Sequence, residues 1–396
     1  MKLTSPVAAL AGNALRHIPQ RLGNALVIVV GIAGAVAVLI PVLALYLGFR
    51  ATLTGDGRAD RAIVLSRAET TEYNSSLSRE SVAVITDAPG VRHDARGEPM
   101  VSAEVVLAAP VARKRDHSDV NVTLRGVGPH YFEMRPELKL IAGRMYRPGT
   151  QELLVGAAAR SQFDGLGIGE HVRLQDGDWT VVGEFAGGSG ARQSELVADA
   201  QTVMSAYKLD TFNSVTATLE SAGAFPKFAT ALSRDGRLFV AARREPQYLA
   251  QASASVNSML RLVAYAIGSI MSLGAVFAAL NATYSAIIAR TVEIATLRAI
   301  GFAASSVALA VLIETLLLSV VGAAVGASLS YTAFGGATIS TLGGALFDSQ
   351  LVYSLAVTPR LIGSIILLAC GLGLVGGLVP AIRAARTNIA VALHEN

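Results

Sequence analysis

The sequence is poor in charged residues: 16% of its 396 residues are Asp, Glu, Lys or Arg, whereas 52% are hydrophobic. The hydrophobic residues are concentrated in long uncharged runs toward the two ends of the chain, which excludes an ordinary soluble globular protein. The net charge of +4 is modest and does not indicate a nucleic-acid partner. The single cysteine, Cys370, lies in an apolar run, so neither an internal disulfide nor a cysteine-ligated metal site is available.

Motifs for catalysis and nucleotide binding are also missing. No segment fits the pattern G-x-x-x-x-G-K-[ST], and the nearest glycine-rich piece, residues 187–194 (GGSGARQS), lacks the lysine and is expected to be a flexible loop. The six histidines show no metal-ligand spacing, and neither H-E-x-x-H nor G-x-S-x-G occurs. We therefore predict no catalytic residue, no metal site and no cofactor in this chain. Any ATP-driven work would need a separate nucleotide-binding subunit.

The long apolar runs predict four transmembrane helices. Residues 25–49 carry no charge, and at about 1.5 Å per residue they reach roughly 37 Å, enough to cross a bilayer. This run is too long for the apolar core of a signal peptide, although the basic segment 1–24 before it resembles a signal-peptide start. Further spans are expected between residues 261 and 290, at about 303–331 and at about 361–382.

The basic residues predict the orientation of these spans. With four spans both termini lie on one side, and the short segments on that side hold most of the flanking positive charge. We therefore expect both termini in the cytoplasm and residues 50–246 outside it. The residues concerned are Lys2, Arg16, Arg21, Arg290, Arg298, Arg383 and Arg386.

Residues 50–246 read as a large extracytoplasmic domain of mixed strands and helices, which predicts an α+β fold in two lobes. Asp176-Gly177 indicates a hairpin turn, and the basic residues 113–115 (RKR) suggest the solvated tip of another hairpin. Residues 247–260 are expected to form a polar stalk helix that runs without a break into the second span. Strands are predicted at residues 62–65, 101–108, 120–124, 152–155, 171–174, 180–184, 214–219 and 238–242, and helices at residues 79–86, 157–163, 200–208 and 226–233.

A short charged segment separates the second and third spans. Arg290, Glu293 and Arg298 fall on one side of a helix through this segment, whereas Ile294 and Leu297 fall on the other. A tight turn at Gly301 leads into the third span. We interpret the segment as an amphipathic helix at the membrane surface on which a soluble partner could dock; a simple basic loop between spans is the alternative.

Glu314 stands about midway through the third predicted span. An ionisable residue in a span is costly and usually faces a partner helix or a cavity, so Glu314 is a candidate for coupling between helices. The alternatives are a Glu near the end of a shifted span, or one that is hydrogen-bonded to a Ser or Thr of a neighbouring helix.

Several of these segments together resemble a known family. The run from Arg290 to Gly301 (RTVEIATLRAIG), with Glu314 further on, resembles the signature of FtsX-like permeases, which occurs in ABC transporter permeases of the MacB, LolC and FtsX type. Residues 140–144 (LIAGR), 152–156 (ELLVG), 166–172 (LGIGEHV) and 179–185 (WTVVGEF) resemble the MacB periplasmic core domain. Residues 379–386 (VPAIRAAR), followed by Ala392-Leu393, resemble the C-terminal end of the family.

The resemblance implies a mechanism. Such permeases work as homodimers with two cytoplasmic ABC ATPase subunits, which bind the ATP and Mg and dock on the helix that corresponds to residues 290–300. Here Glu293, Ile294, Leu297 and Arg298 would make that contact, Arg290 would anchor the helix at the lipid headgroups, and Glu314 would link movements of the spans. ATP hydrolysis then moves the periplasmic domains, a process called mechanotransmission.

The resemblance also implies further partners. In exporters of this kind a periplasmic adaptor and an outer-membrane channel complete the pump. This sequence departs from MacB itself in having no nucleotide-binding domain ahead of the first span, and up to about Pro110 it matches the family pattern weakly.

The sequence therefore predicts a permease subunit of an exporter in the bacterial inner membrane. A permease that signals to a periplasmic cell-wall hydrolase and a lipoprotein-release permease remain alternatives, and a membrane enzyme is disfavoured because no catalytic constellation occurs.

Overall fold

The computed structural model describes residues 22–55, 57–175, 177–188, 191–336, 338–340, 352–355 and 357–386. It divides into two compact units, which we describe separately. The first, the membrane unit, comprises Met1–Leu47, Met259–Ala337 and Leu355–Asn396, and the second, the soluble unit, comprises Gly48–Ser258 and Thr338–Ser354. Most of the predicted basic N-terminal segment, Asp176 of the predicted hairpin turn and the terminal Ala392-Leu393 lie outside the described residues.

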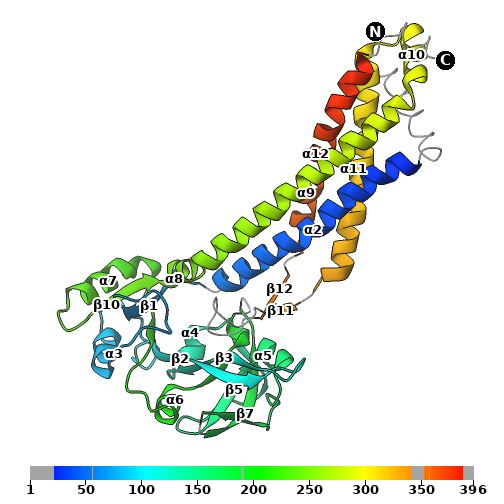
Figure 1. Ribbon diagram of the computed structural model, residues 1–396. Coiled ribbons are helices and arrows are strands. Elements are labelled where there is room, and N and C mark those ends of the chain that lie inside the picture. The colour runs from blue at the N-terminus through cyan, green and yellow to red at the C-terminus, as the bar shows by residue number, and fades with distance from the viewer. Residues whose placement is uncertain are drawn as a thin grey trace. The chain divides into compact units, whose positions relative to one another are not determined.

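The membrane unit is built on long apolar helices, as predicted (Figure 1). Four of its helices are long and apolar enough to cross a membrane: α2 (Leu22–Thr54), α9 (Ala254–Ile288), α11 (Ala304–Phe334) and α12 (Pro359–Ala385). The short helix α10 (Thr291–Ala299) lies between α9 and α11 in the chain. The four predicted spans are thereby confirmed as helices, with ends that differ from the predicted ones by a few residues.

Glycines let α2 and α11 approach closely. A Cβ atom added at Gly322 would lie 2.8 Å from the carbonyl oxygen of Val29, and one at Gly326 would lie 2.5 Å from that of Ala33. Both separations are too short for a side chain, so only glycine allows this packing. The two contacts advance by four residues on each helix in the same direction, and α2 and α11 are therefore parallel.

Gly31 of α2 approaches Ala278 of α9 and Gly268 of α9 approaches Leu39 of α2, so these two helices are antiparallel. Gly376 of α12 packs against Val276 and Ala279 of α9, whereas Gly373 and Gly377 of α12 pack against Ser319 and Thr315 of α11. Residue numbers rise on α12 as they fall on α11, so these two helices are antiparallel. The four helices thus alternate in direction, and the start of α2 and the end of α12 lie at the same end of the bundle as α10.

The soluble unit contains a large mixed sheet, whose strands run in the order β10-β1-β9-β2-β3-β8-β5-β7-β4, with β6 paired to β7. The pairs β3–β8 and β5–β7 are parallel and the other pairs are antiparallel. The strands are β1 (Arg61–Ser66), β2 (Val101–Ala112), β3 (Asp119–Val127), β4 (Lys139–Gly143), β5 (Glu152–Gly156), β6 (His171–Leu174), β7 (Gly177–Ala186), β8 (Leu196–Asp199), β9 (Ser214–Thr218) and β10 (Val240–Arg244).

Helices cover this sheet, and a separate two-stranded sheet pairs β11 (Thr338–Ser340) with β12 (Val352–Ser354). In Figure 1, α7 lies beside β10 and α6 near β3. The helices are α3 (Arg79–Thr86), α4 (Tyr131–Met134), α5 (Ala157–Gln162), α6 (Ala200–Ala206), α7 (Phe225–Arg234) and α8 (Glu245–Ala252), with short 3-10 turns at Arg192–Ser194 and Ala222–Ala224.

The long strand β2 connects the two halves of the sheet. Its residues 101–104 pair with β9, whereas residues 105–112 pair with β3. The two lobes predicted from the sequence therefore share one strand. Because β2 runs unbroken through both halves, the sheet links them directly.

Side chains that alternate in direction along the strands form one apolar layer on each face of the sheet. On β5, Leu153 and Val155 face the larger cluster, whereas Leu154 faces a smaller one with Val182 and Phe185. Successive strand side chains point to opposite faces, so both faces are buried here. Strands β5, β7 and β8 therefore contribute apolar side chains to both faces of the sheet.

The stalk and the glycine-rich segment differ from prediction. The stalk expected at residues 247–260 is divided into α8 and α9 by a turn at Ser253, whose hydroxyl donates to the Leu249 carbonyl (2.8 Å). The glycine-rich segment predicted to be a flexible loop contains the 3-10 turn Arg192–Ser194, in which Ser194 is buried.

Candidate coupling site

The helix α10 begins and ends at well-defined residues. Arg290 is its N-terminal cap residue. At the C-terminal end of α10, Gly301 has a φ of +107°. The N–H of Phe302 donates to the Leu297 carbonyl (3.2 Å), and the N–H of Gly301 donates to the Arg298 carbonyl (3.1 Å). This pattern is a Schellman motif, which favours glycine at the left-handed position. The tight turn predicted at Gly301 is therefore formed by the residue type that the geometry requires.

One face of α10 is packed into the membrane unit. Ile294 is only 6% exposed and lies in an apolar cluster with Ile287 of α9, Val307 of α11 and Ala384 of α12. The sequence places Ile294 in contact with a soluble partner, and its burial corrects that expectation. Ile294 instead holds α10 against the three long helices at this end of the bundle.

The opposite face of α10 is exposed. Val292, Thr296 and Ile300 are spaced four residues apart and all three are exposed, with Ile300 at 73%. Glu293 is exposed beside this stripe, while Leu297 and Arg298 are half-buried at its edge. Residues at this spacing share one face of a helix, so Val292 and Ile300 form an exposed apolar stripe that the sequence analysis did not single out.

Arg290 and Glu314 form an ion pair between α10 and α11. Arg290 Nη1 donates to Glu314 Oε2 (2.9 Å) and Nη2 donates to Oε1 (3.1 Å), a bidentate geometry. The two side chains are 15% and 17% exposed. The guanidinium group therefore binds Glu314, and this corrects the prediction that Arg290 anchors the helix at the headgroups.

Glu314 lies in the first half of α11. It is ten residues after the start of α11, or about 15 Å along the helix axis. Its carboxylate pairs there with Arg290 at the junction of α9 and α10.

A cation–π contact joins α12 to α9 at the same end of the bundle. The guanidinium carbon of Arg383 on α12 lies 5.6 Å from the ring centre of Tyr284 on α9, a cation–π geometry. Together with the Ile294 cluster and the Arg290–Glu314 pair, it connects α9, α10, α11 and α12. The helix α10 is therefore in packed or charged contact with three of the four long helices.

The soluble unit holds a buried charged network that the sequence analysis missed. Arg125 on β3 contacts three carboxylates: Glu72 (3.1 Å), Glu104 (2.8 Å) and Glu195 (2.8 Å). Burial by itself would raise the pKa of Glu72, but the positive charges of Arg125 and Arg192 outweigh it and lower this pKa. The members are far apart in the chain, so no spacing motif could reveal them.

The same network fixes α8 to the sheet. Arg61 Nε lies 2.6 Å from Glu245 and its Nη1 lies 2.7 Å from Glu137. Arg135 stands 3.5 Å from Glu245 and 3.6 Å from Glu104, which joins the two parts of the network. Because Glu245 is the first residue of α8, these pairs hold the helix that directly precedes α9 in the chain.

The architecture defines a membrane protein of four spanning helices with a large mixed α/β domain between the first and second. Two family models match it: the MacB-like periplasmic core domain over residues 25–243 and the FtsX-like permease C-terminal domain over residues 265–389. The chain belongs to the ABC-type permeases of the MacB/FtsX class. Permeases of this class work with cytoplasmic ATPases and are generally not catalytic themselves.

Solved structures include related extracellular and periplasmic regions. The extracellular domain of the noncanonic ABC-type transporter YknZ from Gram-positive bacteria is 16% identical and has a TM-score of 0.33; the match covers 43% of this chain and 88% of that one. The periplasmic region of MacB from Actinobacillus actinomycetemcomitans is 14% identical with a TM-score of 0.37, over 48% and 90%. A domain of a putative permease from Porphyromonas gingivalis is 14% identical with a TM-score of 0.33, over 47% and 91%. A search of the curated proteins finds no match.

Proposed function

We propose that this chain is the permease subunit of a mechanotransmission ABC transporter in the bacterial inner membrane. It would act as a homodimer with two cytoplasmic ATPase subunits, which bind the ATP and Mg, and would export a substrate from the periplasm through an adaptor and an outer-membrane channel. Membership of the permease class supports the ATPase partner. The basic residues at the α10 end of the bundle support a cytoplasmic position for that end.

The observation that carries the proposal is the geometry of α10. Its buried face, through Ile294, is held by the long helices, and its exposed face presents Val292 and Ile300. Arg290 at its start is paired with Glu314 on α11. A partner that pushes on the exposed stripe would therefore move α11 without any chemistry in this chain.

The test is a pull-down of the full chain in mild detergent from its native host, with bound proteins identified by mass spectrometry. The wild type should retain a Walker-type ATPase, whereas Val292→Asp and Ile300→Asp should lose most of it because they place a charge in an apolar contact. Phe239→Asp is the matched control, since Phe239 is an exposed apolar residue of the soluble unit. Equal ATPase recovery from all four proteins would overturn the docking assignment.

The same pull-down distinguishes the kinds of permease. A periplasmic adaptor retained by the wild type supports export. A cell-wall hydrolase in its place would contradict export and favour a signalling permease, and a lipoprotein would favour lipoprotein release. Recovery of the intact dimer without any ATPase would contradict the proposed function as a whole.

A further inference from the structure

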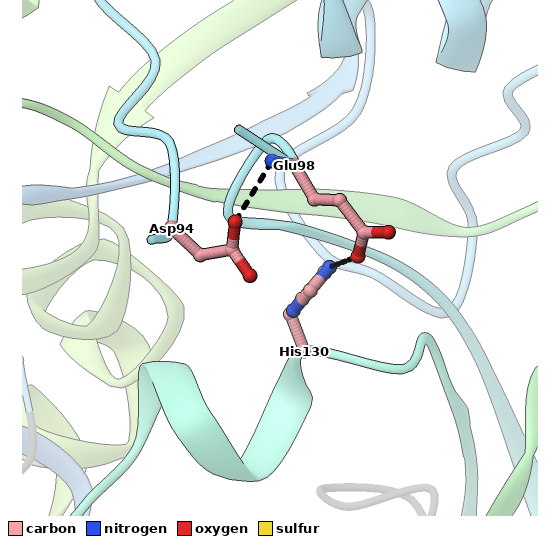
Figure 2. A group of neighbouring side chains, drawn as sticks. All are labelled: Asp94, Glu98 and His130. Carbon is pink, nitrogen blue, oxygen red and sulfur yellow. Dashed lines mark hydrogen bonds and ion pairs between the residues drawn. The ribbon is translucent and has the colours of Figure 1, made fainter. Parts of the chain in front are cut away.

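Three side chains of the soluble unit converge at the start of α4. Asp94 and Glu98 come from the loop that precedes β2, and His130 is the cap residue of α4 (Figure 2). Each offers one ligand atom, and these atoms all lie within 4.8 Å of one another. Because His130 is distant from the other two in the sequence, the spacing of the histidines did not predict this group.

The histidine ring is held in place. Its Nδ1 lies 3.2 Å from Glu133 and its Nε2 lies 3.4 Å from Glu98, and the side chain is only 12% exposed. A proton on Nδ1 would be shared with Glu133, which leaves the Nε2 lone pair directed at the carboxylates. Metal-binding histidines are commonly oriented by such a carboxylate on the other ring nitrogen.

The carboxylate of Asp94 is also fixed. One of its oxygens accepts hydrogen bonds from the backbone N–H groups of Arg96 and Glu98, both at 2.8 Å. Figure 2 shows the other oxygen on the side of the His130 ring.

The spacing suits a small divalent ion. With metal–ligand bonds of about 2.1 Å, two ligands of a tetrahedral ion lie about 3.4 Å apart. The His130 Nε2–Glu98 Oε2 separation is 3.4 Å, and the ligand atom of Asp94 lies within 4.8 Å of the other two. One imidazole and two carboxylates favour a first-row transition metal over calcium or magnesium, which take mainly oxygen ligands.

A cavity adjoins this group. Glu98 and His130 are part of its lining, together with apolar residues that include Val101, Val127 and Phe212, and its volume is about 370 Å³. Three protein ligands would leave one position of a tetrahedral ion open. That position is within reach of water or of a donor atom from a molecule in the cavity.

We propose that Asp94, Glu98 and His130 bind a divalent transition metal ion of the Zn²⁺ type. The site belongs to the soluble unit and stands independently of the ATPase-docking proposal. It differs from the sequence analysis, which predicts no metal site.

The test uses the full-length protein in detergent, with a tag that contains no histidine and with metal removed by a chelator. Zn²⁺ is titrated against a chromophoric competitor, and Co²⁺ is added separately as a spectroscopic probe. We expect one Zn²⁺ per chain with micromolar or tighter affinity, and Co²⁺ absorption bands typical of four-coordinate geometry. A wild-type protein that binds no Zn²⁺ at micromolar concentrations, or gives no such Co²⁺ spectrum, overturns the proposal without the need for any variant.

Variants locate the ion. His130→Ala and Asp94→Asn should weaken Zn²⁺ binding at least about 10-fold, and Glu133→Gln should weaken it less because it acts through the ring of His130. The matched control is His171→Ala, since His171 is an exposed histidine of β6 whose ring pairs with Thr180. Unchanged binding in His130→Ala, or an equal loss in His171→Ala, would place the ion elsewhere and contradict the site.

Discussion

Arg290, the N-terminal cap residue of α10, donates hydrogen bonds to both carboxylate oxygens of Glu314, at 2.9 and 3.1 Å, and thereby links the start of α10 to α11. A charged pair of this kind is costly to keep in a membrane protein unless both partners are satisfied. The bidentate geometry gives both Glu314 oxygens a donor, from Nη1 and Nη2, whereas Nε of Arg290 is buried without a hydrogen-bond partner among the described residues. The pair also links α10 directly to α11.

Breaking this pair should uncouple the two helices. Glu314→Gln keeps the shape but removes the charge, so we expect the ATPase to remain bound while its permease-dependent stimulation falls about 10-fold. The stability of the membrane unit should fall by about 1–3 kcal/mol, as for other charged hydrogen bonds. ATP hydrolysis of the purified complex and thermal unfolding in detergent measure the two effects.

The control exchanges the two charges. The double variant Arg290→Glu with Glu314→Arg should recover part of the ATPase stimulation and part of the stability. If Glu314→Gln shows normal stimulation and the double variant recovers nothing, the pair has no coupling role.

The close contact of α2 with α11 predicts a strict size limit. Gly326→Ala should destabilise the membrane unit by about 1–3 kcal/mol, because the added Cβ meets the Ala33 carbonyl oxygen. Gly371→Ala on α12 is the control, since a Cβ at Gly371 meets no atom within 4 Å. Thermal unfolding of both variants in the same detergent compares them. If Gly326→Ala is as stable as Gly371→Ala, the described packing is wrong.

Removing the centre of the buried network should be severe. Arg125→Met leaves Glu72, Glu104 and Glu195 buried without their common partner, and we expect a loss of about 3–5 kcal/mol in the unfolding free energy of the soluble unit. The only tryptophan, Trp179, is fully buried on β7, so its fluorescence during urea unfolding reports on this unit. Arg115→Met at the exposed hairpin tip should change little. Equal stabilities would show that the network contributes nothing.

The same network predicts an acid dependence. The pKa of Glu72 is lowered from 4.5 to about 2, so the unfolded state binds the proton more readily. The stabilisation is therefore complete above pH about 4.5 and is lost as the pH falls toward about 2. Glu72→Gln should flatten the fall in stability over this range, as measured by urea unfolding at several pH values. A variant with the same acid dependence as the wild type would exclude Glu72 as its source.

The proposed orientation can be tested by cysteine labelling, because Cys370 is the single native cysteine. In a Cys370→Ala background, Arg115→Cys on the soluble unit should react with a membrane-impermeant maleimide in intact cells with a permeabilised outer membrane. Ser305→Cys, exposed at the start of α11, should react only after lysis. The opposite pattern would invert the topology.

Much of the architecture could be predicted because it depends on local patterns. Uncharged runs predict the four spans, and alternation or cap residues predict most strands and helices, with α3 placed at the observed bounds. The strands β4, β8, β11 and β12 and the one-turn helix α4 were missed, although β5 and β6, which are as short as β4 and β8, were predicted. The register of β2 with two different partners depends on contacts distant in sequence.

The coupling site was also only partly predictable, because some of its contacts join residues that are distant in the sequence. The α10 segment and Glu314 were recognised from charge in an apolar context. Helical spacing alone, however, cannot tell which face of α10 packs inward, so Ile294 was assigned to the wrong face and Val292 and Ile300 were overlooked. The partner of Arg290 is 24 residues away, and a pairing at that distance follows from helix packing.

The most direct test of the account is site-specific photo-crosslinking in living cells, with a photoreactive amino acid in place of Ile300. We predict a covalent product between this chain and a Walker-type ATPase, because Ile300 lies on the exposed stripe of α10. The same amino acid at Phe239 in the soluble unit should give no ATPase product. If no ATPase is captured at Ile300 or Val292, or if it is captured at Phe239, then α10 is not the surface on which the ATPase acts.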